Sequence, residues 1–330
     1  MQGFFAIKKI CTDKSVGATE STSPISFPPL NYEKLTSVRL NPDFTAPPAR
    51  ARPLLARNLN HFRIAFALSI LILSAVTISK AIELRPPTLE AWNAYVRTVT
   101  SSMEQRAKGD HPFLWVDESP DLKKRVLAGE VVVAPHDHAK ISNGLIHHWV
   151  GAIFFPGATL DQVNAVLDDY DHYKDIYAPM ITKSKLLERT DQREKVNLLL
   201  VGKAVGVIGA VDTDDEVQTV KVDADKMYSV SNSVRAQEIS DYGKPSEHLL
   251  PQDQGPGYVW RTFGITRLMQ RDGGVYLEME TISLSRGIPW EFRWLVAPVT
   301  EHLPRTVMMQ TLNDTREAVK KAAKSASEQK

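Results

Sequence analysis

The order of the elements predicted for residues 144–330 constrains the fold of this chain more than any other feature of its sequence. These residues indicate a strand at 145–155, a helix that begins at Thr159 and runs to Tyr170, a run of strands, and one amphipathic helix at the end. A curved antiparallel sheet that closes around a long helix leaves an apolar hollow between them. A hollow of that kind is a binding site for a small molecule.

The strands of this run are separated by turn signals, of which the clearest lies at residues 271–274. Its sequence, Arg-Asp-Gly-Gly, is typical of a tight hairpin, because glycine supplies the positive φ that such turns require. The connection at 240–257 is long, polar and rich in proline and glycine, so we expect a surface loop there. The strands are predicted at 181–189, 195–201, 205–222 (with a break at 209 or 214 left open), 227–239, 258–270 and 275–285.

The C-terminal helix is predicted in two parts. Residues 290–297 form a first segment that Pro298 interrupts, and Pro304 occupies the first turn of a second segment, where proline is tolerated. The main domain is therefore assigned to residues 144–323, followed by a disordered tail at 324–330. The stripe expected to face the sheet comprises Val307, Met308, Thr311, Leu312, Thr315, Ala318 and Val319.

Residues 82–143 are expected to form a helical preamble that packs against the main domain. Apolar residues recur at helical spacing over 88–108, and Gly109 can end that helix. A short helix at 122–127 and a strand-like segment at 130–134 follow.

Residues 1–63 differ in composition from the rest of the chain. They contain seven prolines and several Ser/Thr-rich stretches, and their nine basic and four acidic residues give a net charge of +5. We expect a disordered N-terminal extension whose charges are simply solvated.

Residues 64–79 form a run of sixteen uncharged and mainly apolar residues between Arg63 and Lys80. As a helix the run would span about 24 Å, which is short of a hydrocarbon core of about 30 Å. The basic flank, the short apolar run and the small residues beside Lys80 resemble a secretory signal, and the long extension before it leaves open a start downstream of Met1. We predict a signal-peptide-like segment or membrane anchor at 64–81, and hence a protein that is exported (periplasmic or secreted) or anchored through 64–79.

Composition and charge exclude several functions. The 330 residues carry a formal net charge of +1, and no basic stripe is interleaved with aromatic residues, so nucleic acid is not an expected partner. Cys11 is the only cysteine, which rules out a disulfide framework and a thiolate metal site. No nucleotide-binding, hydrolase or metalloprotease motif occurs, and we predict neither a cofactor nor a metal. The sequence does not indicate an oligomeric state.

Local motifs resemble a known superfamily. The segment Phe-Pro-Gly-Ala-Thr at 155–159, and Asp169 and Tyr170 at the end of the next helix, are similar to the opening of START-like (SRPBCC) domains. The hairpin at 272–278 is similar to the close of bacterial members. The resemblance covers about residues 144–320 and implies an α+β helix-grip fold, in which a curved antiparallel sheet wraps around a long C-terminal helix.

The superfamily includes steroidogenic acute regulatory-related lipid-transfer domains, plant pollen-allergen-like proteins, polyketide cyclases and coenzyme Q-binding proteins. The resemblance therefore implies a hydrophobic small-molecule partner such as a lipid, sterol or quinone, and some members are enzymes. These motifs are structural, and the fold alone does not choose among the activities.

The alternation of side chains along a strand predicts the face of the sheet on which each titratable residue lies. His147 and His148 point to opposite faces of one strand, so at most one of them faces the hollow, and a hydrogen-bonded histidine is the simpler interpretation of either. Glu278 and Glu280 share one face, opposite to Met279. If that face is outward, the glutamates are solvated and Met279 lines the hollow.

An inward Glu280 would need a basic partner such as Arg293 or Arg305, because an unpaired buried charge costs several kcal/mol. We expect Glu278 to be outward and leave Glu280 open. Ordinary core packing explains the aromatic candidates about as well as ligand contact does. The candidate ligand-binding residues are His148, Trp260, Phe263, Met279, Glu280, Trp290, Trp294, Arg305 and Met308.

Three functional hypotheses follow. The first is binding, with transport as an extension, of a hydrophobic small molecule by a non-catalytic protein at or near a membrane surface. The second is a cyclase- or aldol-type enzyme in which His148 or Glu280 acts as general base. The third is an interaction module in which residues 82–143 block the mouth of the hollow.

Overall fold

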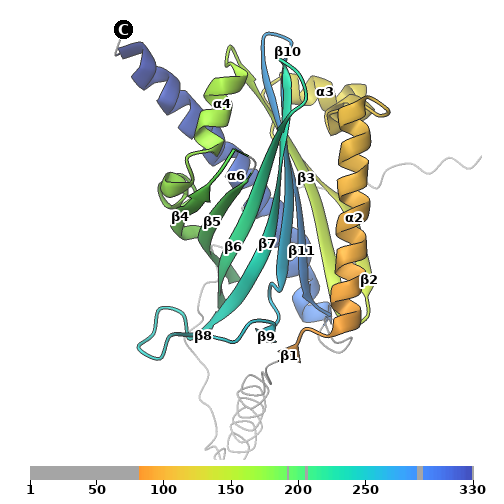
Figure 1. The fold of residues 1–330 in the computed structure, drawn as a ribbon, viewed down its shortest axis with the longest axis vertical. Coiled ribbons are helices and arrows are strands. Elements are labelled where there is room, and N and C mark those ends of the chain that lie inside the picture. Colours follow the sequence, from red (N-terminus) through yellow and green to blue (C-terminus); the bar gives the residue numbers. More distant parts are fainter. Residues whose placement is uncertain (1–81, 192, 205–206, 288–292, 329–330) are drawn as a thin grey trace, which may run out of the picture. The chain divides into compact units, whose positions relative to one another are not determined.

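One large antiparallel sheet organises this computed structural model, which describes residues 82–191, 193–204, 207–287 and 293–328 (Figure 1). The strands follow the order β2-β3-β11-β10-β7-β6-β5-β4, with the short β8 paired to β7. Their bounds are β2 (Val132–Ile141), β3 (Gly144–Pro156), β4 (Ile181–Arg189), β5 (Glu194–Ala204), β6 (Val207–Lys221), β7 (Lys226–Ser240), β8 (His248–Leu249), β10 (Arg261–Arg271) and β11 (Gly274–Arg286).

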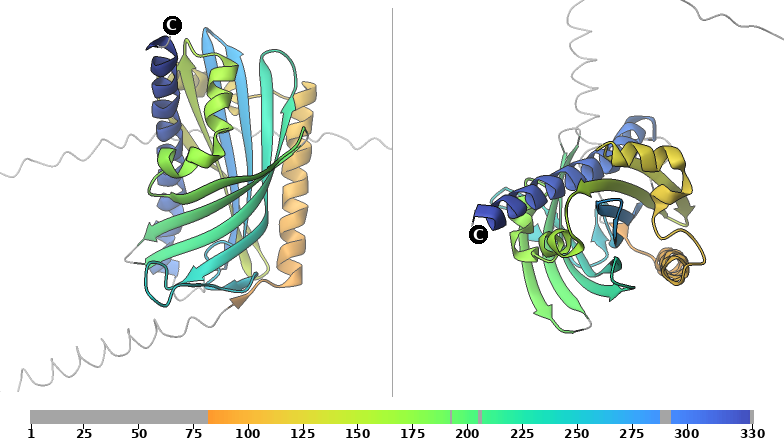
Figure 2. Two further views of the ribbon diagram at one scale, coloured as in Figure 1. Left: turned by 60° about the vertical axis from the view of Figure 1, so that its left-hand side comes forward. Right: turned by 90° about the horizontal axis from the view of Figure 1, so that it is seen from above.

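Helices cover both faces of this curved sheet (Figures 1 and 2). Helices α4 (Leu160–Leu167), α5 (Tyr173–Ile176) and α6 (Arg293–Glu328) lie on the concave face, and α2 (Pro86–Lys108) lies along the convex face. This arrangement confirms the expected α+β helix-grip fold. The remaining elements are β1 (Ile82–Glu83), which pairs with β9 (Gln254–Gly255), the 3-10 turns η1 (Trp115–Glu118) and η2 (Tyr170–His172), and α3 (Pro120–Leu127).

The two faces of the sheet carry separate apolar cores. On the convex face Trp92 and Met103 of α2 pack with Tyr276 of β11. On the concave face Leu312 of α6 packs with Leu277 of β11. Successive residues of a strand point to opposite faces, so one strand serves both cores.

Local sequence signals account for the element boundaries. Thr159 and Gln162 form a reciprocal capping box at the start of α4, which confirms the predicted N-cap. The β10–β11 hairpin turns at Asp272 and Gly273, whose φ values of 55° and 79° suit the turn predicted there. Gly109, at φ 90°, ends α2 as expected.

The C-terminal helix differs from its prediction in three respects. Helix α6 runs without interruption through Pro298 and Pro304, because a proline removes one backbone donor while the remaining helical bonds hold the axis. It continues to Glu328, so residues 324–328 are helical rather than part of a disordered tail. Val307 is exposed, whereas Met308, Leu312, Thr315 and Val319 form the buried stripe.

The N-terminal preamble, residues 82–143, contributes a strand to the main sheet. The strand-like segment expected at 130–134 is β2, which extends to Ile141 and pairs with β3 along its length. The expected domain boundary at residue 144 therefore falls inside a hairpin of one sheet. β6 runs from Val207 to Lys221 without a break at 209, and its register with β7 shifts between Asp214 and Asp215.

No helix within the described ranges is long and apolar enough to cross a membrane. The segment predicted as a signal or anchor, 64–81, and the expected disordered extension, 1–63, both lie outside the described residues.

Close packing of α6 on β3 generates a stability prediction. A Cβ atom at Gly151 would lie 2.7 Å from Met308 Sδ and 2.8 Å from Leu312 Cδ1. We expect Gly151→Val to lower the free energy of unfolding by about 1–3 kcal/mol through overpacking, measured by urea denaturation. Gly202→Val is the matched control, because nothing lies within 4 Å of a Cβ there. Equal effects of the two substitutions would contradict the packing described.

Candidate functional site

A cavity of about 150 Å³ lies on the concave face of the sheet, between the α4–α5 segment and strands β5, β6, β7, β10 and β11. Among the described residues, none from α6 and none from the preamble 82–143 lines it. Its wall is formed by Asn164, Leu167, Asp168, Tyr170, Tyr173, Val196, Leu198, Asp215, Val217, Met227, Tyr228, Ser229, Ser231, Thr266, Leu268 and Met279.

Most of this wall is apolar. Tyr170 and Tyr173 lean on each other with ring centroids 5.2 Å apart, and they pack against Val196 and Val217. The Tyr173 hydroxyl donates to the Leu167 carbonyl, so its ring is fixed beside the cavity. The cavity is therefore bounded by oriented side chains.

Asp215 is the buried acidic residue of this wall. It pairs with Val196 on β5 and with Ser233 on β7, which places it on the concave face, and it is only 6% exposed. Thr213 donates a hydrogen bond of 2.6 Å to its Oδ2, and the Thr262 hydroxyl lies at a long 3.4 Å from its Oδ1. Burial raises the pKa of this carboxyl to about 6, against the lowering effect of the two hydroxyl contacts.

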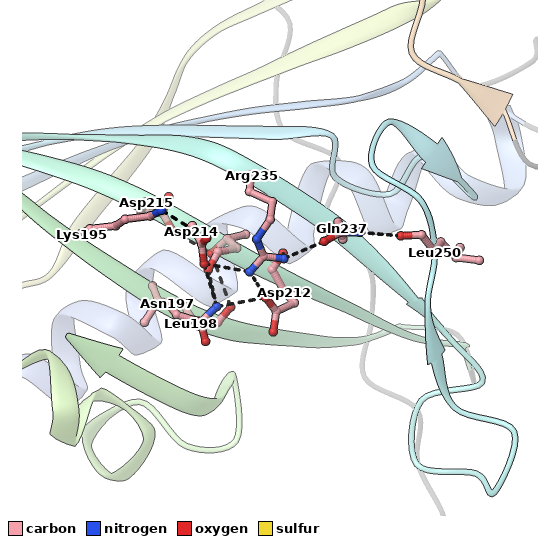
Figure 3. Close-up of polar contacts among 10 residues, drawn as sticks. Lys195, Asn197, Leu198, Asp212, Asp214, Asp215, Arg235, Gln237 and Leu250 are labelled. Atoms are coloured by element: carbon pink, nitrogen blue, oxygen red, sulfur yellow. Dashed lines mark hydrogen bonds and ion pairs between the residues drawn. The ribbon is translucent and has the colours of Figure 1, made fainter. Parts of the chain in front are cut away.

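The neighbouring acids have a different role on the opposite face of the sheet. Asp212 and Asp214 both form ion pairs with Arg235, and Asn197 donates to both carboxylates at 3.0 Å (Figure 3). Arg235 holds the pKa of Asp214 below its usual range through a hydrogen bond. These pairings leave Arg235 committed to the outer face, from which its charge lowers the pKa of Asp215 by less than burial raises it.

Sequence reasoning missed Asp215, although a signal was present. Val211, Thr213, Asp215 and Val217 alternate with Asp212, Asp214 and Glu216 along β6. The first set shares the buried face and the second set the outer face. An acidic run is usually solvated, so the single aspartate in the buried set does not stand out in the sequence.

A second group of buried polar side chains lies on the convex face, beneath α2. Arg267 contacts both Glu278, at 3.2 Å, and Glu280. His148 donates from Nε2 to Glu280 Oε1 at 2.7 Å, and its Nδ1 lies 2.8 Å from the Tyr95 hydroxyl of α2. Every member of this group has a partner.

The backbone of the preamble completes this network. The N–H groups of Trp115 and Val116 each donate to Glu278 at 2.9 Å. Burial nonetheless raises the pKa of Glu278. Burial acts in the same direction on Glu280, but the hydrogen bond from His148 and the charge of Arg267 outweigh it and hold the pKa of Glu280 at about 2. The network thus fastens residues 82–143 to the sheet.

This placement corrects the expectations for the glutamates. Glu278 and Glu280 do face away from α6, but they are buried by the preamble and are not solvated. The basic partner of Glu280 is Arg267, from the neighbouring strand, and neither Arg293 nor Arg305. Neither Glu280 nor His148 lines the cavity. The hypothesis of a cyclase- or aldol-type enzyme that uses one of them as general base in the cavity is therefore not supported.

The other predicted site residues are divided between the two faces. Trp260 and Phe263 belong to the convex core under α2. Met308 packs against β3 in the concave core but does not line the cavity, and Arg305 is exposed. Met279 is the one that lines the cavity among the seven whose side chains the structure describes. Trp290 lies outside the described residues, and the side chain of Trp294 is not described.

Comparisons with known proteins give structural matches only. No protein-family model and no curated protein matches the chain. Solved structures that match include a STAR-related lipid transfer protein from Xanthomonas axonopodis (20% identity, 56% of this chain and 98% of that chain, TM-score 0.39). They also include the ZhuI aromatase/cyclase from a Streptomyces species (16%, 54% and 96%, TM-score 0.38) and human StAR-related lipid transfer protein 5 (16%, 67% and 98%, TM-score 0.37).

Two of these three proteins are named as STAR-related lipid transfer proteins. At such identities and TM-scores they say nothing about ligand or activity. The functional inference therefore depends on the cavity and its residues.

The raised pKa of Asp215 predicts how the free energy of unfolding changes with pH. A carboxyl whose pKa rises from 3.8 to about 6 on folding favours the folded state below pH 3.8, and this advantage is lost as pH rises through about 6. Relative to Asp215→Asn, the wild type should lose about 2–3 kcal/mol of unfolding free energy between pH 4 and pH 7, since one pKa unit corresponds to about 1.4 kcal/mol. Denaturant titrations at several pH values measure this. A pH-independent difference between the two proteins would show that Asp215 is not desolvated.

Proposed function

We propose that this protein binds a hydrophobic small molecule in the concave-face cavity. The observation that supports the proposal most is the cavity itself, with walls formed by fixed aromatic and aliphatic side chains such as Tyr173 and Leu268. Apolar surface removed from water contributes about 25 cal/mol per Å², so even a small guest gains affinity there.

The cavity volume narrows the class of ligand. Small-molecule pockets commonly measure about 300–1,000 Å³, whereas a cavity of about 150 Å³ can hold a guest as small as benzene. The cavity measures about 150 Å³. We infer that the guest is a small aromatic or short-chain molecule, or the apolar end of a larger one. A whole sterol or phospholipid, which the sequence resemblance allowed, exceeds this space.

Filling the cavity should weaken binding. Thr266 faces the cavity from β10, and Thr266→Phe would place a ring in it. With phenethyl alcohol as the probe, we expect saturable binding by the full chain in titration calorimetry and a loss of at least about tenfold in affinity in Thr266→Phe.

Val220→Phe is the matched control, because Val220 is 41% exposed on strand β6 of the same sheet and does not line the cavity. It should bind as the wild type does. If the wild type takes up no apolar probe, or if Thr266→Phe binds unchanged, the proposed function is wrong.

We further propose that the protein meets its ligand at a membrane, after export or while anchored through residues 64–79. The support is the sequence of that segment, a short apolar run behind a basic flank. N-terminal sequencing of the mature protein and membrane fractionation test the proposal. We expect either a start near residue 82 or a membrane-bound full chain. A protein that begins at Met1 and shows no membrane association would contradict it.

A further inference from the structure

The charges that line the cavity are of one sign. Asp215 and Asp168 both belong to its lining, and no lysine, arginine or histidine is found among the described residues that line it. Arg189 lowers the pKa of Asp168 through its charge, but burial and Glu194 raise it, and Arg189 is itself paired with Glu194. The protein thus offers a guest two acidic groups and no basic one.

The Asp215 carboxylate also has unused capacity to accept hydrogen bonds. A carboxylate has about four lone-pair sites, and the hydroxyls of Thr213 and, at 3.4 Å, Thr262 occupy two of them. The hydroxyls of Ser229, Ser231 and Thr266 line the same cavity from β7 and β10. A donor group entering the cavity would therefore find a carboxylate and several hydroxyl acceptors around it.

The placement of Asp215 is not explained by the fold. Each buried carboxylate of the convex network, Glu278 and Glu280, is paired with Arg267. Asp215 is as deeply buried as Glu280 but has no cationic partner among the described residues, because Arg235 is held by Asp212 and Asp214. A desolvated carboxylate of this kind is stabilised when a cation arrives beside it.

We propose that the cavity selects a hydrophobic molecule that carries a protonated amine, with the ammonium group on Asp215 and the apolar part against Tyr173 and Leu268. This inference depends on the proposed function and specifies its ligand class. Both acidic groups disfavour a carboxylate or phosphate head in the same position. No covalent step is involved.

The experiment compares three probes of similar size that differ in their polar group: phenethylamine, phenethyl alcohol and phenylacetate. Titration calorimetry with the full chain at pH 7 gives their affinities. Charge-assisted hydrogen bonds contribute more than neutral ones, so we expect the amine to bind about 10-fold to 100-fold more tightly than the alcohol, and phenylacetate to bind least.

Two variants assign the preference to one side chain. Asp215→Asn should lose the preference for the amine over the alcohol. Asp214→Asn is the control, because Asp214 is adjacent to Asp215 on β6 but lies on the outer face. It should keep the preference.

The outcomes separate this inference from the proposed function. If the alcohol binds as tightly as the amine, or if Asp215→Asn keeps the preference, the amine assignment is wrong while the cavity remains a binding site. If none of the three probes binds to the wild type, the proposed function fails as well.

Discussion

Burial of the Asp215 carboxyl without a cation is the constraint on which this account depends. A group of this kind costs folding free energy, which is visible in a pKa raised by desolvation to about 6. The two hydroxyl contacts do not offset that effect. A side chain that costs stability and faces a cavity is more consistent with ligand recognition than with packing.

The convex network shows how the same chain treats a carboxylate that serves the fold. Glu280 is equally buried, yet Arg267 and His148 lower its pKa to about 2. Through Tyr95 and the backbone of Trp115 this network also fastens the preamble to the sheet. The contrast in cationic partners separates Glu280, a structural group, from Asp215, a candidate binding group, within one sheet.

Much of the fold could be predicted from local chemistry. The capping box at Thr159, the hairpin at Asp272 and Gly273, and the alternating strands predicted their elements closely, because each signal acts over a few residues. The continuity of α6 could not be predicted in this way. Pro298 is a strong helix breaker locally, and the long helix that contains it is a property of the tertiary structure.

The site was harder to predict than the fold, for a physical reason. The preamble buries the convex face, so both faces of β11 carry buried apolar residues, and hydrophobicity does not reveal which of them meets the cavity. Tyr276 and Leu277 are equally buried on opposite faces. Aromatic residues such as Trp260 were therefore assigned to the cavity wall and lie instead under α2. The alternation of side chains along β6 does place Asp215 on the same face as Val211 and Val217. It does not show that this face meets the cavity.

The most direct measurement is an NMR titration of the Asp215 side-chain carboxyl carbon, with and without saturating phenethylamine. The account predicts a pKa near 6 in the free protein and a lower pKa when the amine is bound, because the ammonium group stabilises the carboxylate. A carboxyl that titrates near 3.8 and does not respond to the amine would contradict the account.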